Sequence, residues 1–122
     1  EVSDKDSRRL LGSSYRVSEI VAGTTPGDEA AARLCHGFAL SESALRRFLV
    51  QARPVSATEL HDRFDGAPCY VRAILTTKGH RAELEILASG SATLSMDGGP
   101  MERFVCEEKC DALLALPPMA PR

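Results

Sequence analysis

Residues 69–96 read CYVRAILTTKGHRAELEILASGSATLSM, and this stretch decides the fold. Apolar residues alternate with polar ones at a period of two, the pattern of strands that bury one face. The residues expected to point inward are Cys69, Val71, Ala73 and Leu75, then Ala82, Leu84, Ile86 and Ala88. Turn residues interrupt the alternation at Lys78-Gly79 and again at Ser89-Gly90-Ser91. Because turns this short join antiparallel neighbours, the stretch predicts consecutive antiparallel strands.

The same pattern continues toward the C-terminus. Ala92, Leu94 and Met96 continue a third strand, 97–100 (DGGP) breaks the chain, and Met101–Cys106 is expected to form a fourth strand. The prediction is therefore an antiparallel meander of about four strands. Nearer the N-terminus, Tyr15–Ala22 is expected to be a short separate strand, with Val17 and either Ile20 or Val21 facing inward.

One main helix is predicted over 41–52. Its apolar residues recur at i, i+3, i+4 and i+7, namely Leu45, Phe48, Leu49 and Ala52. Ser41 is a good N-cap, and Pro54 ends the helix because its ring cannot donate a backbone hydrogen bond. Packed on the buried face of the meander, this helix gives an α+β fold. Shorter helical turns are expected at 28–34, capped by Asp28, and at 111–116.

Length and charge limit the class of protein. A chain of 122 residues fits one domain, expected at 15–116 between a flexible N-terminal segment (1–14) and a Pro-rich tail (117–122). Fifteen Lys and Arg against seventeen Asp and Glu give a net charge of −2, which argues against nucleic-acid binding. The sequence holds no apolar run of the ~18–20 residues that a membrane helix needs, so no membrane span is expected.

The four cysteines suggest export. An even number in a small chain favours two disulfides in an oxidising compartment, although three pairings are possible. The chain begins at Glu1 rather than Met, so we expect either that a signal peptide was removed or that the chain was trimmed.

Several groups could carry chemistry, and each has a simpler structural interpretation. A thiolate–imidazole pair could form from Cys35 or Cys69 with His36, His61 or His80, but the even cysteine count favours oxidation. Cys106 and Cys110 have a spacing near that of redox or zinc motifs, yet a local disulfide at a strand end explains it better. His61-Asp62 more simply ties a loop together, and Glu83 and Glu85 fall on a solvated strand face. No convergent catalytic set emerges, so we expect a binding protein without a cofactor or metal, not an enzyme.

A family resemblance adds to this interpretation. The pattern is Cys35-x-x-Phe38-x-Leu40-Ser41-Glu42, the helix, His61-Asp62, Pro68-Cys69-Tyr70-Val71, a hairpin, a Gly-rich bend and Cys106…Cys110. Over roughly residues 33–111 it resembles small exported bacterial immunity proteins that inhibit type VI secretion peptidoglycan amidases. The chain departs from that pattern in two ways. The last pair is Cys-x-x-x-Cys instead of Cys-x-x-Cys, and Ala67 and Leu84 stand where aromatic residues are usual.

The resemblance implies periplasmic residence and one-to-one inhibition of a secreted amidase with a papain-like Cys–His site. The partner would be bound by a loop that enters its cleft, here the bend Ser89-Gly90-Ser91, with Arg72, Arg81 and Tyr70 as flanking anchors. The alternative is a non-enzymatic envelope accessory or ligand-binding domain. For the cysteines we predict a local bridge, Cys106–Cys110, and a long one, Cys35–Cys69, that joins a strand on the helix side to the meander.

Overall fold

The computed structural model describes residues 14–24, 30, 33, 35, 37–59 and 69–114. Its elements are β1 (Arg16–Thr24), α3 (Glu42–Gln51), β2 (Arg53–Pro54), β3 (Cys69–Thr77), β4 (His80–Leu87), β5 (Ser91–Met96), β6 (Met101–Val105), the 3-10 turn η1 (Glu108–Cys110) and α5 (Asp111–Leu114). The predictions that involve the cap at Asp28, His36, the His61-Asp62 pair and the 67–68 departure lie outside the described residues.

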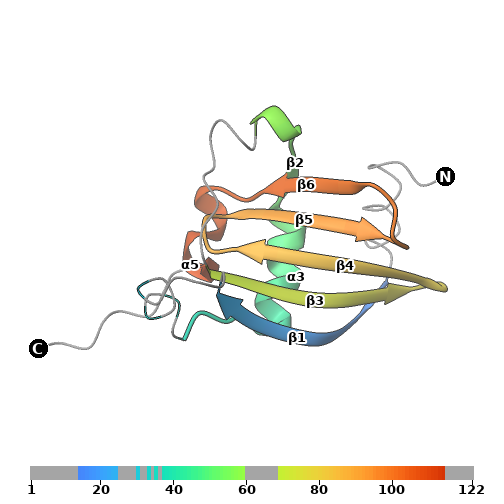
Figure 1. Ribbon diagram of the computed structural model, residues 1–122, viewed down its shortest axis with the longest axis horizontal. Coiled ribbons are helices and arrows are strands. Elements are labelled where there is room, and N and C mark those ends of the chain that lie inside the picture. The colour runs from blue at the N-terminus through green and yellow to red at the C-terminus, as the bar shows by residue number, and fades with distance from the viewer. Residues whose placement is uncertain are drawn as a thin grey trace, which may run out of the picture.

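The described strands form one six-stranded antiparallel sheet in the order β1-β3-β4-β5-β6-β2 (Figure 1). The predicted four-strand meander is its centre, β3 to β6. The expected number of about four strands was too low because each edge carries one more. β1 joins beside β3 across a long sequence separation, and β2 adds only two residues beside β6, too few to show a period.

Strands β3 and β4 have the alternation that the sequence predicts. Odd-numbered residues of β3 and even-numbered residues of β4 face the core, with Leu75, Ala82 and Ile86 fully buried. The turn between them has positive φ at both central residues, 48° at Lys78 and 84° at Gly79, as in the two-residue hairpin turns that match strand twist. The inward-facing set of the two strands is therefore confirmed.

Helix α3 lies across one face of the sheet (Figure 1). It starts after Ser41, whose Oγ accepts a hydrogen bond from the backbone N–H of Ala44 at 3.1 Å, so the predicted cap is confirmed. Leu45 and Phe48 are fully buried against the sheet, whereas Leu49 is partly buried. Ala52 closes the last turn by donating its N–H to the carbonyl of Phe48.

Strand β1 differs from its prediction at one point. Glu19 has a φ of +53°, and the register with β3 shifts between Ser18 and Val21. This irregularity changes the face to which the following residues point. Val17 packs on the core as expected, but Ile20 and Val21 are 37% and 57% exposed, so the prediction that one of them faces inward is wrong.

Both predicted disulfides are present. Cys35–Cys69 and Cys106–Cys110 have Cα–Cα distances of 5.2 and 5.6 Å, and all four cysteines are buried. Cys35 lies in a turn whose carbonyl accepts from Phe38 N, not in the strand that was expected there. The long bridge therefore ties the segment before α3 to the start of β3. Among the described residues, no helix combines the length and apolar character needed to cross a membrane.

Candidate functional site

The sheet has two unlike faces. The inner face packs against α3, and the face opposite, called here the outer face, carries the residues that alternate with the core. Across β3 and β4 these are Tyr70, Arg72, Ile74 and Thr76 with Arg81, Glu83, Glu85 and Leu87, and Thr93, Ser95, Met101 and Arg103 extend the set on β5 and β6. The side chains of Arg72, Arg81 and Glu83 are 58–67% exposed, and Met101 is 51% exposed. All three predicted anchors therefore lie on one face.

Arg72 is the centre of a polar cluster on this face. Its Nε donates to Glu85 Oε2 at 2.8 Å from the cross-strand partner position, and this bond raises the pKa of the guanidinium. The guanidinium also lies 4.2 Å from the centroid of the Tyr70 ring, a cation–π geometry. A flexible arginine is thereby held in one orientation, with most of its surface in solvent.

Tyr70, predicted as a flanking anchor of the binding surface, is half-buried. It stands opposite Gly23 of the edge strand β1, and a methyl group built on Gly23 would lie 2.5 Å from the Tyr70 hydroxyl. The ring thus covers a glycine that leaves room for it, and Arg72 covers the ring in turn. Tyr70 therefore both holds the guanidinium of Arg72 in place and contributes the exposed part of its own ring to the surface.

Arg81 belongs to a different part of the face. It pairs with Thr76, four residues along β3 from Arg72, a distance of about 13 Å along the strand. Its backbone N–H donates to Asp97 Oδ1 at 2.9 Å, and His80 Nδ1 lies 2.5 Å from Asp97 Oδ2. These two contacts, first the Arg81 amide and then His80, hold the pKa of Asp97 below its ordinary value. The predicted anchors thus share a face without forming one cluster.

The predicted plug at the β4–β5 bend is only partly accessible. Ser89 is exposed, whereas Gly90 is buried and Ser91 is only 4% exposed, with its Oγ 3.3 Å from that of Ser89. Gly90 has a φ of +100°, and a methyl group built on it would lie 2.7 Å from the carbonyl oxygen of Cys106. Gly90 therefore allows a close backbone approach, and its own carbonyl accepts from Cys106 N at 2.8 Å. Insertion of this bend into a partner stays a prediction, and Ser89 is the residue of the bend that is exposed enough to make the contact.

A shallow hollow of about 300 Å³ lies on the outer face. Val21 and Ile74 line it on the β1 side and Met101 on the β6 side, with Glu83 and Ser95 between Ile74 and Met101 in the strand register. Glu83, Glu85 and Arg72 stand around it. Apolar, charged and hydroxyl side chains thus alternate across this hollow, a mixed composition that is compatible with a protein-binding surface.

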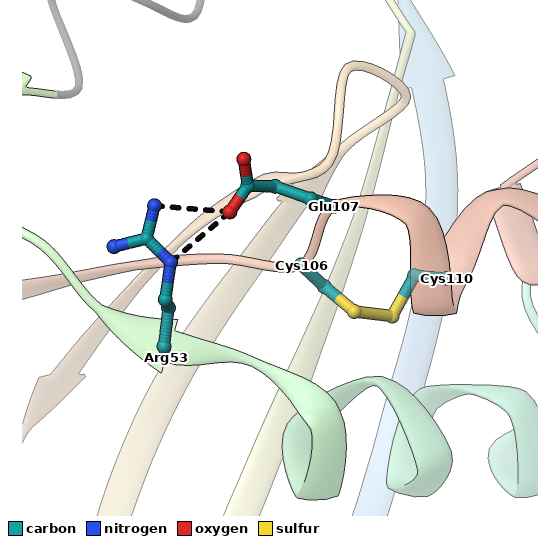
Figure 2. Close-up of a disulfide and its surroundings, with 4 residues drawn as sticks. All are labelled: Arg53, Cys106, Glu107 and Cys110. Carbon is teal, nitrogen blue, oxygen red and sulfur yellow. Dashed lines mark hydrogen bonds and ion pairs between the residues drawn. A yellow bond between two sulfur atoms is a disulfide. The ribbon is translucent and has the colours of Figure 1, made fainter.

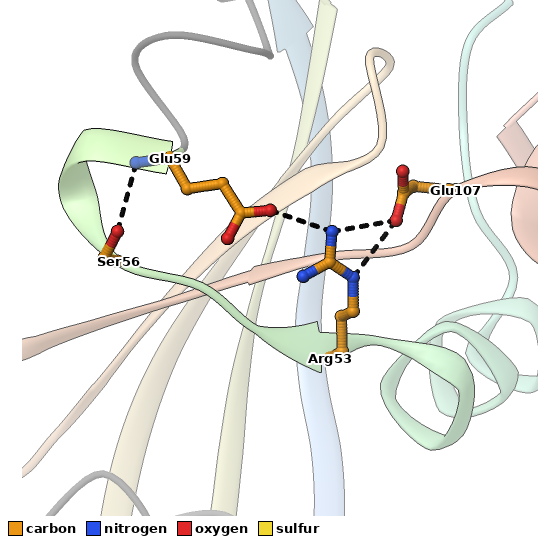
Figure 3. Close-up of polar contacts among 4 residues, drawn as sticks. All are labelled: Arg53, Ser56, Glu59 and Glu107. Atoms are coloured by element: carbon orange, nitrogen blue, oxygen red, sulfur yellow. Dashed lines mark hydrogen bonds and ion pairs between the residues drawn. The ribbon is translucent and has the colours of Figure 1, made fainter.

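The Cys106–Cys110 loop lies at the opposite edge of the sheet, where the ion pairs of one arginine hold it. Figure 2 shows Arg53 of β2 beside the bridge, with its Nε and Nη2 3.1 and 3.0 Å from Glu107 Oε1. Figure 3 shows that the same guanidinium also reaches Glu59 Oε2 at 2.9 Å, while Ser56 Oγ accepts from the Glu59 amide. The pKa of Arg53 is raised by these bonds, first to Glu59 and then to Glu107. The bridge and the arginine together fix a short exposed loop.

The cysteine-based hypotheses require free thiols. All four cysteines are in disulfides, so the thiolate–imidazole pair and the cysteine–zinc site lack the sulfur ligand or nucleophile that they need. Glu83 and Glu85 point outward as predicted. Within the described part of the chain, no group of three His, Cys, Asp or Glu side chains is placed to hold a metal ion.

No family model matches the chain, and no curated protein or solved structure shows significant similarity to it.

One group of residues was not predicted from the sequence, and it lies at the end of the sheet where β1 meets the β3–β4 hairpin. Arg16 pairs with Thr76, and Thr76 pairs with Arg81, so the two arginines flank one threonine. The hairpin turn at Lys78-Gly79 fixes the pairing of Thr76 with Arg81, which could have been read from the sequence. The position of Arg16 could not, because it depends on the long-range pairing of β1.

Proposed function

We propose that this protein is a disulfide-braced binding module that acts outside the cytoplasm and recognises another protein through the outer face of its sheet. The single observation that carries this proposal is the asymmetry of the sheet. One face is sealed by α3, while the other presents a fixed arginine, a tyrosine and exposed apolar side chains. Arginine and tyrosine are the residues most enriched among interface hot spots.

The framework suits such a role energetically. Two buried disulfides and a six-stranded sheet keep the surface in one conformation before it meets a partner. A preformed surface loses little conformational entropy on association, so more of the contact energy appears as affinity. The disulfides are also compatible with an extracytoplasmic location, because such bonds persist in oxidising compartments.

For the partner we propose a secreted peptidoglycan amidase, which would make the chain a periplasmic immunity protein. This assignment is supported by the sequence resemblance over roughly residues 33–111. Binding of the outer face next to the catalytic cleft would exclude peptidoglycan, and Ser89 at the exposed corner of the β4–β5 bend is the residue proposed to reach the cleft. Its small hydroxyl can enter a groove without burying a charge.

The test combines the purified chain with a panel of secreted peptidoglycan amidases and follows hydrolysis of purified peptidoglycan. We expect inhibition that is complete at one equivalent for the cognate enzyme. If no amidase in the panel is bound or inhibited, the amidase is the wrong partner.

The variant Ser89→Arg tests the proposed plug, because Ser89 is exposed and its replacement leaves the core intact. Ser91→Arg would test folding instead, since Ser91 is buried. The matched control is Arg47→Ala, on an exposed position of α3 away from the sheet. If Ser89→Arg inhibits the amidase as well as the wild type does, the bend does not enter the cleft.

A further inference from the structure

Three cationic side chains, Arg16, Lys78 and Arg81, gather at the end of the sheet and are called here the basic corner. Arg16 and Arg81 stand on either side of Thr76 on the outer face, one strand away in each direction. Their Cα atoms are therefore about 10 Å apart, twice the spacing of neighbouring strands. Lys78 follows in the tight turn, where its positive φ places it at the exposed tip of the hairpin.

These residues line a hollow of about 770 Å³ that wraps the end of the sheet. Tyr15, Thr76, Thr77 and His80 line it together with the three cations, and the Thr77 hydroxyl donates to the carbonyl of Ser14. None of the described residues that line it is a carboxylate. The hollow thus offers several hydrogen-bond donors and a concentrated positive charge.

Two carboxylates, Asp97 and Glu83, lie beside the basic corner and offset only part of its charge. Both oxygens of Asp97 are engaged, Oδ2 by His80 Nδ1 and Oδ1 by the backbone N–H of Arg81, and neither contact is to the Arg81 guanidinium. Glu83 Oε2 lies 3.6 Å from Arg81 Nη1, a long contact between side chains that are 58% and 67% exposed and that water screens strongly. Arg16 and Lys78 form no ion pair within the described part of the chain. A surplus of positive charge therefore persists on a protein whose net charge is −2.

We propose that the basic corner binds an acidic segment of the partner protein through its Asp or Glu carboxylates. The planar guanidinium fork matches a carboxylate, and two arginines about 10 Å apart suit carboxylates two or three residues apart in an extended segment. A protein segment is favoured over nucleic acid because three cations are a small footprint for a phosphate backbone. The corner also continues the outer face proposed to meet the partner. The inference rests on the proposed function only in taking the partner to be a protein, not an amidase.

The test is a titration of the ¹⁵N-labelled full chain with a tetraglutamate peptide, followed by NMR. Tetralysine and inorganic phosphate at matched ionic strength are the comparison probes. We expect saturable shifts of the backbone amides of Arg16, Lys78 and Arg81 with tetraglutamate alone. Arg16→Gln and Arg81→Gln should each weaken binding by up to about fivefold, whereas Arg47→Gln on α3 should not change it.

Three results would overturn the inference: no saturable shift with tetraglutamate, equal shifts with tetralysine, or equal binding of phosphate, which would reveal a general anion site. The outcome is separable from that of the amidase assay. Amidase binding without a tetraglutamate response removes the basic corner alone. A tetraglutamate response without any amidase partner removes the amidase assignment alone.

Discussion

Replacing Phe48 by alanine should strongly destabilise the fold. Among the described residues Phe48 is the largest of the fully buried side chains, and it projects from α3 into the core beneath the sheet. Removing a buried phenyl ring loses its transfer free energy and leaves a cavity, which together cost about 3–5 kcal/mol. Val50→Ala is the control on the same helix, because Val50 is 76% exposed and its loss should change stability by less than about 0.5 kcal/mol.

The effect is large compared with the stability of a domain of this size, about 5–15 kcal/mol. With a urea m-value near 2 kcal/mol/M, a loss of about 4 kcal/mol moves the unfolding midpoint by about 2 M. Urea unfolding followed by circular dichroism measures both variants against the wild type. A loss below about 1 kcal/mol for Phe48→Ala, or an equal loss for Val50→Ala, would show that α3 does not pack on the sheet through this residue.

Three further predictions concern the framework. Replacing both cysteines of the Cys35–Cys69 bridge by alanine should lower the free energy of unfolding by about 4 kcal/mol, and the same change at Cys106–Cys110 by about 2 kcal/mol. The first bridge closes the longer loop, with a sequence separation of 34 residues against 4, and so removes more entropy from the unfolded chain. Equal losses in urea unfolding would contradict this. Gly90→Ala should lower the melting temperature more than Gly79→Ala does. Both glycines have a positive φ, but only at Gly90 would the added methyl group lie 2.7 Å from a backbone oxygen. Equal shifts of the melting temperature in calorimetry would mean that the close approach at Gly90 is not maintained. The pKa of Asp97 is depressed in the folded state, so its contribution should be full above about pH 4 and vanish as the pH falls through the folded pKa. Asp97→Asn should therefore be less stable than the wild type at pH 7, and the difference should shrink as the pH falls through the folded pKa. A difference in the free energy of unfolding that does not vary with pH would rule out this contribution.

Much of the fold could be predicted because its signals are local. The alternation from Cys69 to Leu87 and the two-residue turn at Lys78-Gly79 determine register without reference to the rest of the chain. The cap at Ser41 and the apolar spacing of α3 are likewise contained within a dozen residues. β1 was expected as a strand at Tyr15–Ala22, but its irregularity at Glu19 and its pairing with β3 could not be predicted in the same way, and β2 is too short to have a period.

The candidate site was less accessible from the sequence. The outward positions of Arg72 and Arg81 followed from the period of two, but the contact of Tyr70 with Gly23 requires the pairing of β1 with β3. The burial of Gly90 and Ser91 depends on the approach of the Cys106 backbone, a tertiary contact that a turn signal does not contain. Local pattern fixes which face a side chain points to, whereas long-range pairing fixes what it meets there.

The central claim is that the outer face of the sheet binds the partner protein. The most direct test compares two arginine substitutions, one on the outer face of the sheet and one on the exposed side of α3. Arg72→Ala removes the arginine held over Tyr70 on the outer face, and Arg47→Ala removes an equal charge from the exposed side of α3. Calorimetry with the partner recovered in the amidase panel measures both affinities. We predict a loss of about tenfold or more for Arg72→Ala and less than about twofold for Arg47→Ala. Equal losses, or a larger loss for Arg47→Ala, would contradict the claim and place the binding surface on the helical side of the molecule.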